Sequence, residues 1–276
     1  MVSPQAIPNI RLNNGVLMPQ LGLGVYKVRE GEEVKNAVRW AIEAGYRHID
    51  TAALYENEAG VGEAIRESGV PREEIFVTTK VWNTDQGYEK TLKAFEASRK
   101  RLGFEYVDLY LVHWPGRDKF IDTYRALEKL LSEGLVRAIG VSNFKEHHLE
   151  RLMAETSIVP AVNQVEFHPR LQQKSLLEYC RAKGIALEAW APLMKGQLDH
   201  PVLVRLAAKY GKSPAQIVLR WHIQLGVIAI PKSVHRERIF ANADIFDFEL
   251  APEEMAEIGT MDENHRFGKD PDEFLF

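Results

Sequence analysis

The chain has 276 residues, with 35 Lys and Arg against 39 Asp and Glu, which gives a formal net charge of −4. Hydrophobic residues make up 45% and charged residues 27%, a composition that excludes a chain dominated by disorder. The slightly acidic balance lacks the positive charge typical of nucleic-acid-binding proteins, so we expect no nucleic-acid partner. The length fits either one α/β barrel of about 250 residues or two smaller domains.

Cysteine content and the first residues bear on the compartment. The single cysteine, Cys180, cannot form an internal disulfide, which fits a reducing compartment. The first eight residues have neither the basic start nor the apolar stretch of a secretory signal. No run approaches the roughly 18 apolar residues that span a bilayer. We therefore expect a cytoplasmic protein without a membrane partner.

Short β-rich runs alternate with longer helical patterns along almost the whole chain. Eight runs predict strands, at residues 21–25, 46–50, 75–80, 107–112, 137–141, 161–165, 185–190 and 227–230. Helical patterns occupy residues 32–43, 58–67, 88–102, 124–132, 174–182 and 202–209. Each helical pattern is followed by a glycine, which predicts a helix end because glycine adopts the left-handed conformation at little cost.

Alternating strands and helices indicate parallel strands joined by right-handed crossovers. Eight such units in this length favour a single α/β domain over residues 1–276, folded as a closed (β/α)8 TIM barrel; a doubly wound sheet is the alternative. Before the first unit, residues 10–12 and 16–18 flank Asn13-Asn14-Gly15 and predict an N-terminal β-hairpin that caps the barrel bottom.

Polar side chains follow the predicted strands at the end where a barrel carries its active site. Asp50, Lys80 and His113 come from neighbouring strand ends, and Tyr55 follows Asp50 by five residues. A Lys ammonium favours loss of the Tyr proton, and an Asp beside the Lys keeps it charged. Each residue alone has an ordinary structural explanation. Together they predict a proton donor for a carbonyl oxygen that gains negative charge.

A second cluster predicts a nucleotide site. Lys232 and Ser233 follow the last strand, and Arg238 and Asn242 share one face of the next helix. The loops after strands seven and eight commonly bind phosphate in this barrel class. Trp190 ends strand seven, where its ring could stack on a nicotinamide, and the ring's carboxamide could be bound by Ser142, Asn143 and Gln164.

Five segments resemble the motifs of the aldo-keto reductase family, in order and at family spacing. They are GYRHIDTAALYENE at 45–58, LYLVHWP at 109–115, GVSNF at 140–144, NQVEFHP at 163–169 and IPKS at 230–233. The chain is most similar to the bacterial branch that contains glyoxal, methylglyoxal and diketogluconate reductases.

The resemblance implies a TIM barrel that binds NADPH in extended form and reduces carbonyl groups. It implies Tyr55 as proton donor in a tetrad with Asp50, Lys80 and His113. Cofactor contacts are implied for Val25, Asp50, Ser142, Asn143, Gln164, Trp190, Pro192, Leu193, Gln197, Lys232, Ser233, Arg238 and Asn242. A Glu often precedes the last of these in the family, whereas this chain has Ala241. The phosphate contacts are intact, so we expect NADPH rather than NADH.

The substrate is expected to be a small aldehyde, ketone or dicarbonyl such as glyoxal or methylglyoxal. Tyr26, Trp82 and Trp114, with His113, are the predicted substrate contacts. The loop at 192–199 and the tail after residue 262 are short compared with those of steroid-handling members, which favours an open pocket. We expect a monomer and no metal.

Three alternatives remain open at this stage. The first is a Rossmann dehydrogenase, but Gly22-Leu-Gly24 lacks the third glycine of the Rossmann fingerprint. A metal hydrolase would use His113, His168, Asp50 or Glu188, but no His-x-His closes a strand. Some members of the resembled family are channel-associated subunits that bind nucleotide, and the intact tetrad argues against that role here.

Overall fold

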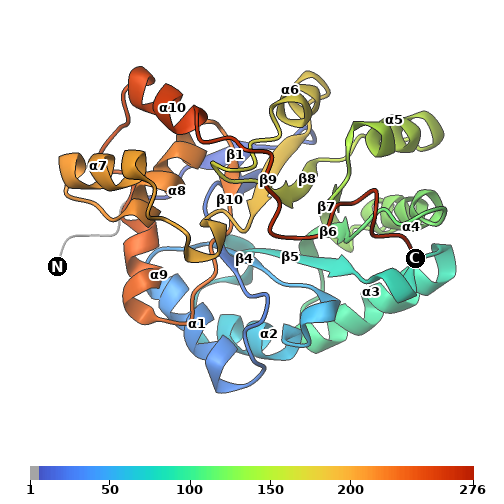
Figure 1. The fold of residues 1–276 in the computed structure, drawn as a ribbon. Helices are drawn as coiled ribbons and strands as arrows, with labels where there is room; N and C mark the ends of the chain where they lie inside the picture. Colours follow the sequence, from blue (N-terminus) through green and yellow to red (C-terminus); the bar gives the residue numbers. More distant parts are fainter. Residues whose placement is uncertain (1–5) are drawn as a thin grey trace.

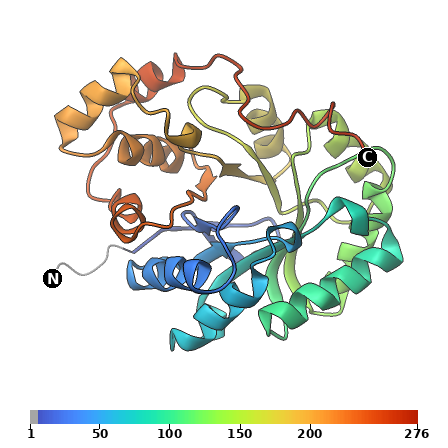
Figure 2. The ribbon, with the colours of Figure 1, turned by 60° about the horizontal axis from the view of Figure 1, so that its bottom comes forward.

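Eight parallel strands form one sheet in the computed structural model, which describes residues 6–276 (Figures 1 and 2). The expectation about a secretory signal concerns the first eight residues, of which 1–5 lie outside the described part. Strand order in the sheet follows chain order. The strands are β3 (Leu23–Gly24), β4 (His48–Asp50), β5 (Phe76–Val81), β6 (Val107–Val112), β7 (Val136–Ser142), β8 (Val162–Glu166), β9 (Ala186–Trp190) and β10 (Ile228–Ala229).

The first and last strands meet and close the sheet. Leu21 forms a parallel bridge with Ala229. The Ala229 N–H donates to the Gln20 carbonyl and the Gly22 N–H donates to the Ala229 carbonyl, both across 3.0 Å. The predicted (β/α)8 barrel is therefore confirmed, and the doubly wound alternative is wrong.

Ten α-helices occur among residues 6–276, and the crossover helices surround the barrel (Figure 2). They are α1 (Glu32–Glu43), α2 (Glu58–Glu67), α3 (Tyr88–Leu102), α4 (Phe120–Ser132), α5 (Glu146–Glu155), α6 (Lys174–Ala182), α7 (Pro201–Tyr210), α8 (Pro214–Gln224), α9 (Arg236–Ala243) and α10 (Pro252–Gly259). The six predicted glycine stops have positive φ, from 63° at Gly211 to 99° at Gly45. Helix α4 begins four residues before its predicted start, and the predicted helical ranges do not include α5, α8 or α10.

An N-terminal hairpin closes the bottom of the barrel, as predicted. Its strands β1 (Asn9–Arg11) and β2 (Leu17–Pro19) are each displaced by one residue from the expected ranges. The Asn13 and Asn14 amides donate to the carbonyls of Pro160 and Arg137, which lie at the starts of the β8 and β7 region. A buried cluster joins the hairpin to the strand interiors: Leu12, Met18, Phe76, Leu109, Leu111, Ala138, Ala161, Val162 and Ile228.

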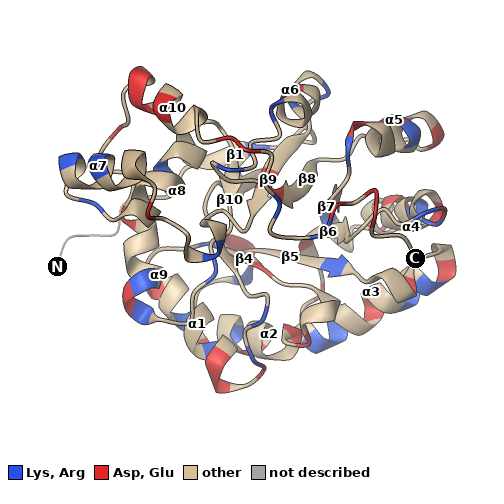
Figure 3. Ribbon diagram, in the orientation of Figure 1, with Lys and Arg blue, Asp and Glu red and all other residues tan. Residues whose placement is uncertain are grey.

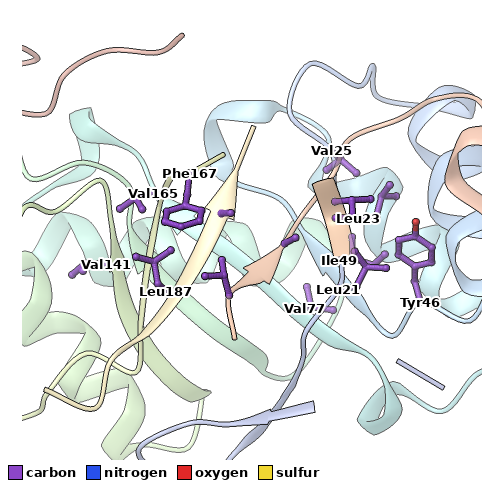
Figure 4. Packing of buried hydrophobic residues seen from close by; sticks show 14 of the residues in the cluster. Leu21, Leu23, Val25, Tyr46, Ile49, Val77, Val141, Val165, Phe167 and Leu187 are labelled. Carbon is purple, nitrogen blue, oxygen red and sulfur yellow. The ribbon is translucent and has the colours of Figure 1, made fainter. Parts of the chain in front are cut away.

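A second and larger core lies between the sheet and the helices. Figure 4 shows part of it, with Leu23, Ile49 and Tyr46 close together. The Tyr46 hydroxyl donates to the Ile239 carbonyl of α9 across 2.7 Å. Because outward residues of the strands fill this layer, the inward residues that alternate with them face the barrel axis. This alternation places the polar residues described below at the barrel mouth.

Two surface features bear on partners. Over residues 6–276 no helix is both long and apolar enough to cross a membrane. Basic and acidic residues are interspersed along outer helices such as α3 and α4 (Figure 3).

Candidate active site

The carboxyl ends of the strands bring most of the predicted polar residues to one mouth of the barrel. Asp50 ends β4, Ser142 ends β7 and Trp190 ends β9. Gln164 of β8 lies opposite Ser142 on one side and Glu188 on the other. The predicted strand ends at residue 165, whereas β8 continues to Glu166. The inward residue Glu166 therefore also reaches this mouth.

Lys80 joins two of the predicted catalytic residues. Its Nζ donates to Asp50 Oδ2 across 2.7 Å and to Tyr55 Oη across 3.1 Å. A third hydrogen bond, to the Thr51 carbonyl, measures 3.0 Å. The Gln164 amide donates to the other carboxylate oxygen of Asp50 across 2.7 Å. Lys80 thus lies with its ammonium fixed between a carboxylate and a phenol.

The charges of this group follow from burial and from the ion pair. Burial lowers the pKa of Lys80, but the Asp50 carboxylate and the Tyr55 phenol outweigh it, so the net direction is upward. Burial raises the pKa of Tyr55, and Lys80 opposes this only in part. The effect of Lys80 has the predicted sign, yet the net direction for Tyr55 is the opposite. At neutral pH the site therefore holds a Lys ammonium and a protonated Tyr.

His113 follows β6, and its imidazole lies against the Tyr55 ring. Its imidazole centroid lies 5.8 Å from that of Tyr55 and 5.1 Å from that of Trp82, edge to face in both pairs. Burial, assisted by the Lys80 charge, lowers the pKa of His113 well below its usual range. Its Nδ1 is buried without a partner in the described part of the chain. The imidazole is therefore neutral and lies beside the Tyr55 ring.

Asn143 links Trp190 to the His113 backbone. Its Oδ1 accepts from Trp190 Nε1 across 2.8 Å, and its Nδ2 donates to the His113 carbonyl across 3.0 Å. Asn143 has a φ of +64°, a left-handed conformation that Asn tolerates better than most residues. The Ser142 hydroxyl donates to the Gln164 carbonyl across 2.7 Å. The predicted carboxamide residues thus lie together, with these donors already engaged.

The predicted phosphate residues lie after β10 and on α9. Lys232 and Arg238 are exposed, and neither forms an ion pair within residues 6–276. Ser233 and Asn242 are buried. The Ser233 hydroxyl accepts from the His235 N–H across 3.1 Å. Ser233 thus offers a fixed hydroxyl in a segment with an exposed cation on either side in the chain, Lys232 before it and Arg238 after it.

The remaining predicted contacts have mixed surroundings. Val25 and Pro192 are buried and Leu193 is half-buried. Gln197 is exposed and accepts a hydrogen bond from Arg170. Tyr26 is 51% exposed, and its ring centroid lies 5.0 Å from that of Tyr55. Trp114 is buried with its ring edge-on to Phe274 at 4.8 Å, so the C-terminal segment covers it.

Asn57 is a buried residue whose role sequence reasoning missed. Its amide donates to the Val25 and Val28 carbonyls, both across 2.9 Å, and its Oδ1 accepts from the Thr51 hydroxyl across 2.7 Å. It therefore fixes the loop after β3 against the segment that carries Tyr55. Its place in the motif at 45–58 was the available signal.

One group of three metal-type ligands occurs within residues 6–276, and it contains none of the predicted catalytic residues. It comprises His147, His148 and Asp272. Lys145 Nζ lies 2.6 Å from Asp272 Oδ2, which already neutralises the carboxylate. His148 Nδ1 accepts from the Lys145 N–H across 3.0 Å, whereas a metal-bound histidine normally donates from its second nitrogen. We assign no metal role to this group.

Comparison with known proteins agrees with this geometry. The family model described as "Aldo/keto reductase family" matches residues 20–263 of the chain. The chain is 60% identical over 268 residues to the glyoxal reductase of Bacillus subtilis, covering 97% of each. It is 59% identical to the 9,11-endoperoxide prostaglandin H2 reductase of Trypanosoma cruzi, covering 96% of this chain and 95% of that protein. It is 48% identical to the methylglyoxal reductase DkgA of Salmonella typhimurium, covering 96% and 97%.

A solved structure is similar over nearly the whole chain. The Bombyx mori aldo-keto reductase in complex with NADP has a TM-score of 0.92 and 41% identity, with 97% of each chain covered. The matched residues include the whole mouth of the barrel from Asp50 to Asn242. The chain belongs to the aldo/keto reductase family.

Proposed function

We propose that this protein reduces small aldehydes, ketones and dicarbonyls to alcohols with NADPH, and that Tyr55 donates the proton. The observation that carries the proposal is the position of Lys80, which donates hydrogen bonds to both Asp50 and Tyr55. A cation at a phenol oxygen stabilises the phenolate that remains after proton donation.

The Tyr55 proton is retained until negative charge develops on the substrate oxygen. Burial keeps the pKa of Tyr55 above its usual value in the absence of such a charge. When the oxygen gains charge, the proton moves to it and the phenolate is stabilised by Lys80 at 3.1 Å. Asp50 keeps Lys80 protonated, and Gln164 fixes the other Asp50 oxygen. General acid catalysis of this kind contributes roughly 10²–10⁴-fold to the rate.

His113 orients the substrate oxygen. Its ring is neutral and lies edge-on to Tyr55, so an oxygen that accepts from Tyr55 also lies close to the imidazole. A neutral imidazole can donate one hydrogen bond without competing with Tyr55 as the acid.

The site also fits a nicotinamide nucleotide. Trp190 is only partly buried, and its indole N–H is fixed to Asn143, so a ring face is available for stacking. Lys232 and Arg238 provide exposed cations and Ser233 a hydroxyl for a 2′-phosphate. Such a phosphate favours NADPH over NADH. When bound, NADPH supplies the hydride.

The substrate class rests on relatives and on the rings around Tyr55. Two relatives are named glyoxal and methylglyoxal reductases, and a third is named for a prostaglandin endoperoxide. Tyr26 and Trp82 lie beside Tyr55 and His113 and suit a small carbonyl compound. We further propose that residues 1–276 act as one domain, as a monomer in the cytoplasm, without metal or nucleic acid.

A spectrophotometric assay of NADPH oxidation tests the proposal. The panel contains methylglyoxal, glyoxal, a simple aliphatic aldehyde, a prostaglandin endoperoxide and a ketosteroid, each with NADPH and with NADH. We expect the dicarbonyls and the aldehyde to be turned over with NADPH. Faster turnover of the steroid than of every small carbonyl would contradict the proposed substrate class. NADPH binding without turnover of any compound would support the nucleotide-binding subunit instead.

A further inference from the structure

The C-terminal segment after α10 crosses the mouth of the barrel and ends near α4 (Figure 1). Glu166, a buried residue at the end of β8, holds it there. Its Oε2 accepts from the Phe267 N–H and its Oε1 from the Gly268 N–H, both across 2.8 Å. His168 Nε2 lies 2.7 Å from the same Oε2. Hydrogen bonds to a carboxylate are stronger than neutral ones, so this anchor is firm.

Glu166 is ionised in this arrangement. Burial raises its pKa, but the hydrogen bonds from His168, Phe267 and Gly268 outweigh burial and the net direction is downward. The negative charge is matched by donors that come mostly from the C-terminal segment. Removal of the segment would leave a buried carboxylate with too few partners.

Gly268 packs directly on the indole of Trp190. A methyl group at this position would overlap Cη2 of Trp190 and would lie 3.2 Å from Cζ3 and 3.0 Å from Glu166 Oε1. The φ of Gly268 is not in the left-handed region, so the backbone itself accepts alanine. Glycine is therefore needed at residue 268 because of its contact with the Trp190 indole, and not because of its backbone conformation.

The opposite edge of the same indole is also fixed. Trp190 Nε1 donates to Asn143 Oδ1 across 2.8 Å, while the far ring edge rests on Gly268. Glu166 of β8 and Trp190 of β9 are paired in the sheet, so the residue that anchors the C-terminal segment is next to the residue that carries the indole. The plane of the indole is thus set from two sides, by a side chain at one edge and by the tail backbone at the other.

We propose that Gly268, held by Glu166, is a positioning residue that sets the Trp190 indole for stacking on the nicotinamide ring. The proposal rests on the cofactor site given above. It assigns the C-terminal segment a part in cofactor affinity, in addition to its contact with Trp114. A second anchor, Lys145 with Asp270 and Asp272, holds the segment nearer its end.

The test compares Gly268→Ala with Gly259→Ala. Gly259 has open space at its Cβ and no positive φ, so its alanine variant controls for the added methyl group. The dissociation constant of NADPH is measured through the change in nucleotide fluorescence on binding. We expect Gly268→Ala to weaken NADPH about 3- to 10-fold, the size of one displaced aromatic contact. Gly259→Ala should bind NADPH as the parent does, and Glu166→Gln should weaken it in the same direction as Gly268→Ala.

A double-mutant cycle with Trp190→Phe shows whether the effect passes through the indole. Because a phenyl ring lacks the edge that Gly268 contacts, Gly268→Ala should have under twofold effect in the Trp190→Phe background. Equal effects of Gly268→Ala in both backgrounds, or none in the parent, would overturn the positioning role. If Trp190→Phe itself leaves NADPH affinity unchanged, the proposed stacking role of Trp190 fails and the positioning role fails with it.

Discussion

The ammonium of Lys80 donates a hydrogen bond to the phenol oxygen of Tyr55 across 3.1 Å. The same ammonium is paired with Asp50, and its side chain is fully buried. A buried cation that remains charged can offset a negative charge on its neighbour far better than one in water. The chemistry proposed for Tyr55 depends on this relationship.

Replacing Lys80 with methionine should remove this stabilisation while keeping much of the volume. We expect kcat to fall by at least about 10²-fold, because the phenolate is then formed in a buried site without a cation. NADPH affinity should change by less than about threefold. Stopped-flow measurement of NADPH oxidation and a binding titration give the two quantities. A variant that keeps its fold and more than a tenth of the parent kcat would contradict this role.

The neutral state of His113 has a consequence for pH dependence. Burial, with the charge of Lys80, holds its pKa well below the ordinary value of about 6.5. The ring therefore stays neutral as the pH crosses 6.5, and kcat/KM for reduction should show no inflection there. A profile from pH 5.5 to 8.5 checks this. An inflection near 6.5 that disappears in His113→Asn would show that His113 titrates in this range.

Arg238 is expected to discriminate between the two nicotinamide cofactors. Arg238→Ala should weaken NADPH by roughly 10- to 100-fold, the value of a hydrogen bond to a charged group, and NADH by less than threefold. Arg236→Ala is the matched control, since Arg236 is an exposed neighbour on α9 whose ion pair with Glu43 measures 3.9 Å. Equal losses for NADPH and NADH would contradict the 2′-phosphate role.

Glu188 lies inside the barrel, where its Oε1 is 3.5 Å from His48 Nε2. Burial, with the Asp50 charge, raises its pKa to about 8, whereas an unfolded chain gives about 4.3. Between these values the folded protein holds a proton that the unfolded chain has lost. The free energy of unfolding therefore falls as the pH rises through this window, by at most ~1.4 kcal/mol per pH unit.

Glu188→Gln isolates this effect because glutamine does not titrate. The neighbouring His48, whose pKa burial lowers to about 4, is neutral in the folded protein between pH 6.5 and 8 and so adds no slope of its own in this range. We expect urea unfolding to show the variant gaining stability relative to the parent between pH 6.5 and 8. Glu178→Gln, at an exposed residue of α6, is the control and should show no such trend. A pH-independent difference for Glu188→Gln would contradict the raised pKa.

Much of the barrel could be predicted because its signals are local. Glycine stops such as Gly103 and Gly184 have positive φ in the structure, as the left-handed helix end requires. The start of α8, which the predicted helical ranges do not include, also carries a local signal, a capping box: the Ser213 hydroxyl accepts from Gln216 N–H, and the Gln216 side chain accepts from Ser213 N–H.

The candidate site was predictable only where strand ends supply its residues. Asp50 and Lys80 follow from the topology, because neighbouring parallel strands deliver their ends to one mouth. The anchor of Gly268 on Glu166 joins residues 102 apart in sequence, and nothing local to either residue indicates it. The direction of the Tyr55 pKa also could not be read from the sequence, because it depends on how far burial outweighs a nearby charge.

Single-turnover reduction of methylglyoxal by Tyr55→Phe tests the central claim most directly. The variant lacks only the phenol oxygen that Lys80 contacts, so NADPH should still bind with near-parent affinity. We predict that the rate of NADPH oxidation falls by about 10²-fold or more, the contribution of a general acid. Asn83→Ala, outside the proposed machinery, serves as a folding and handling control. A Tyr55→Phe enzyme that binds NADPH and reduces methylglyoxal at the parent rate would contradict the assignment of Tyr55 as proton donor.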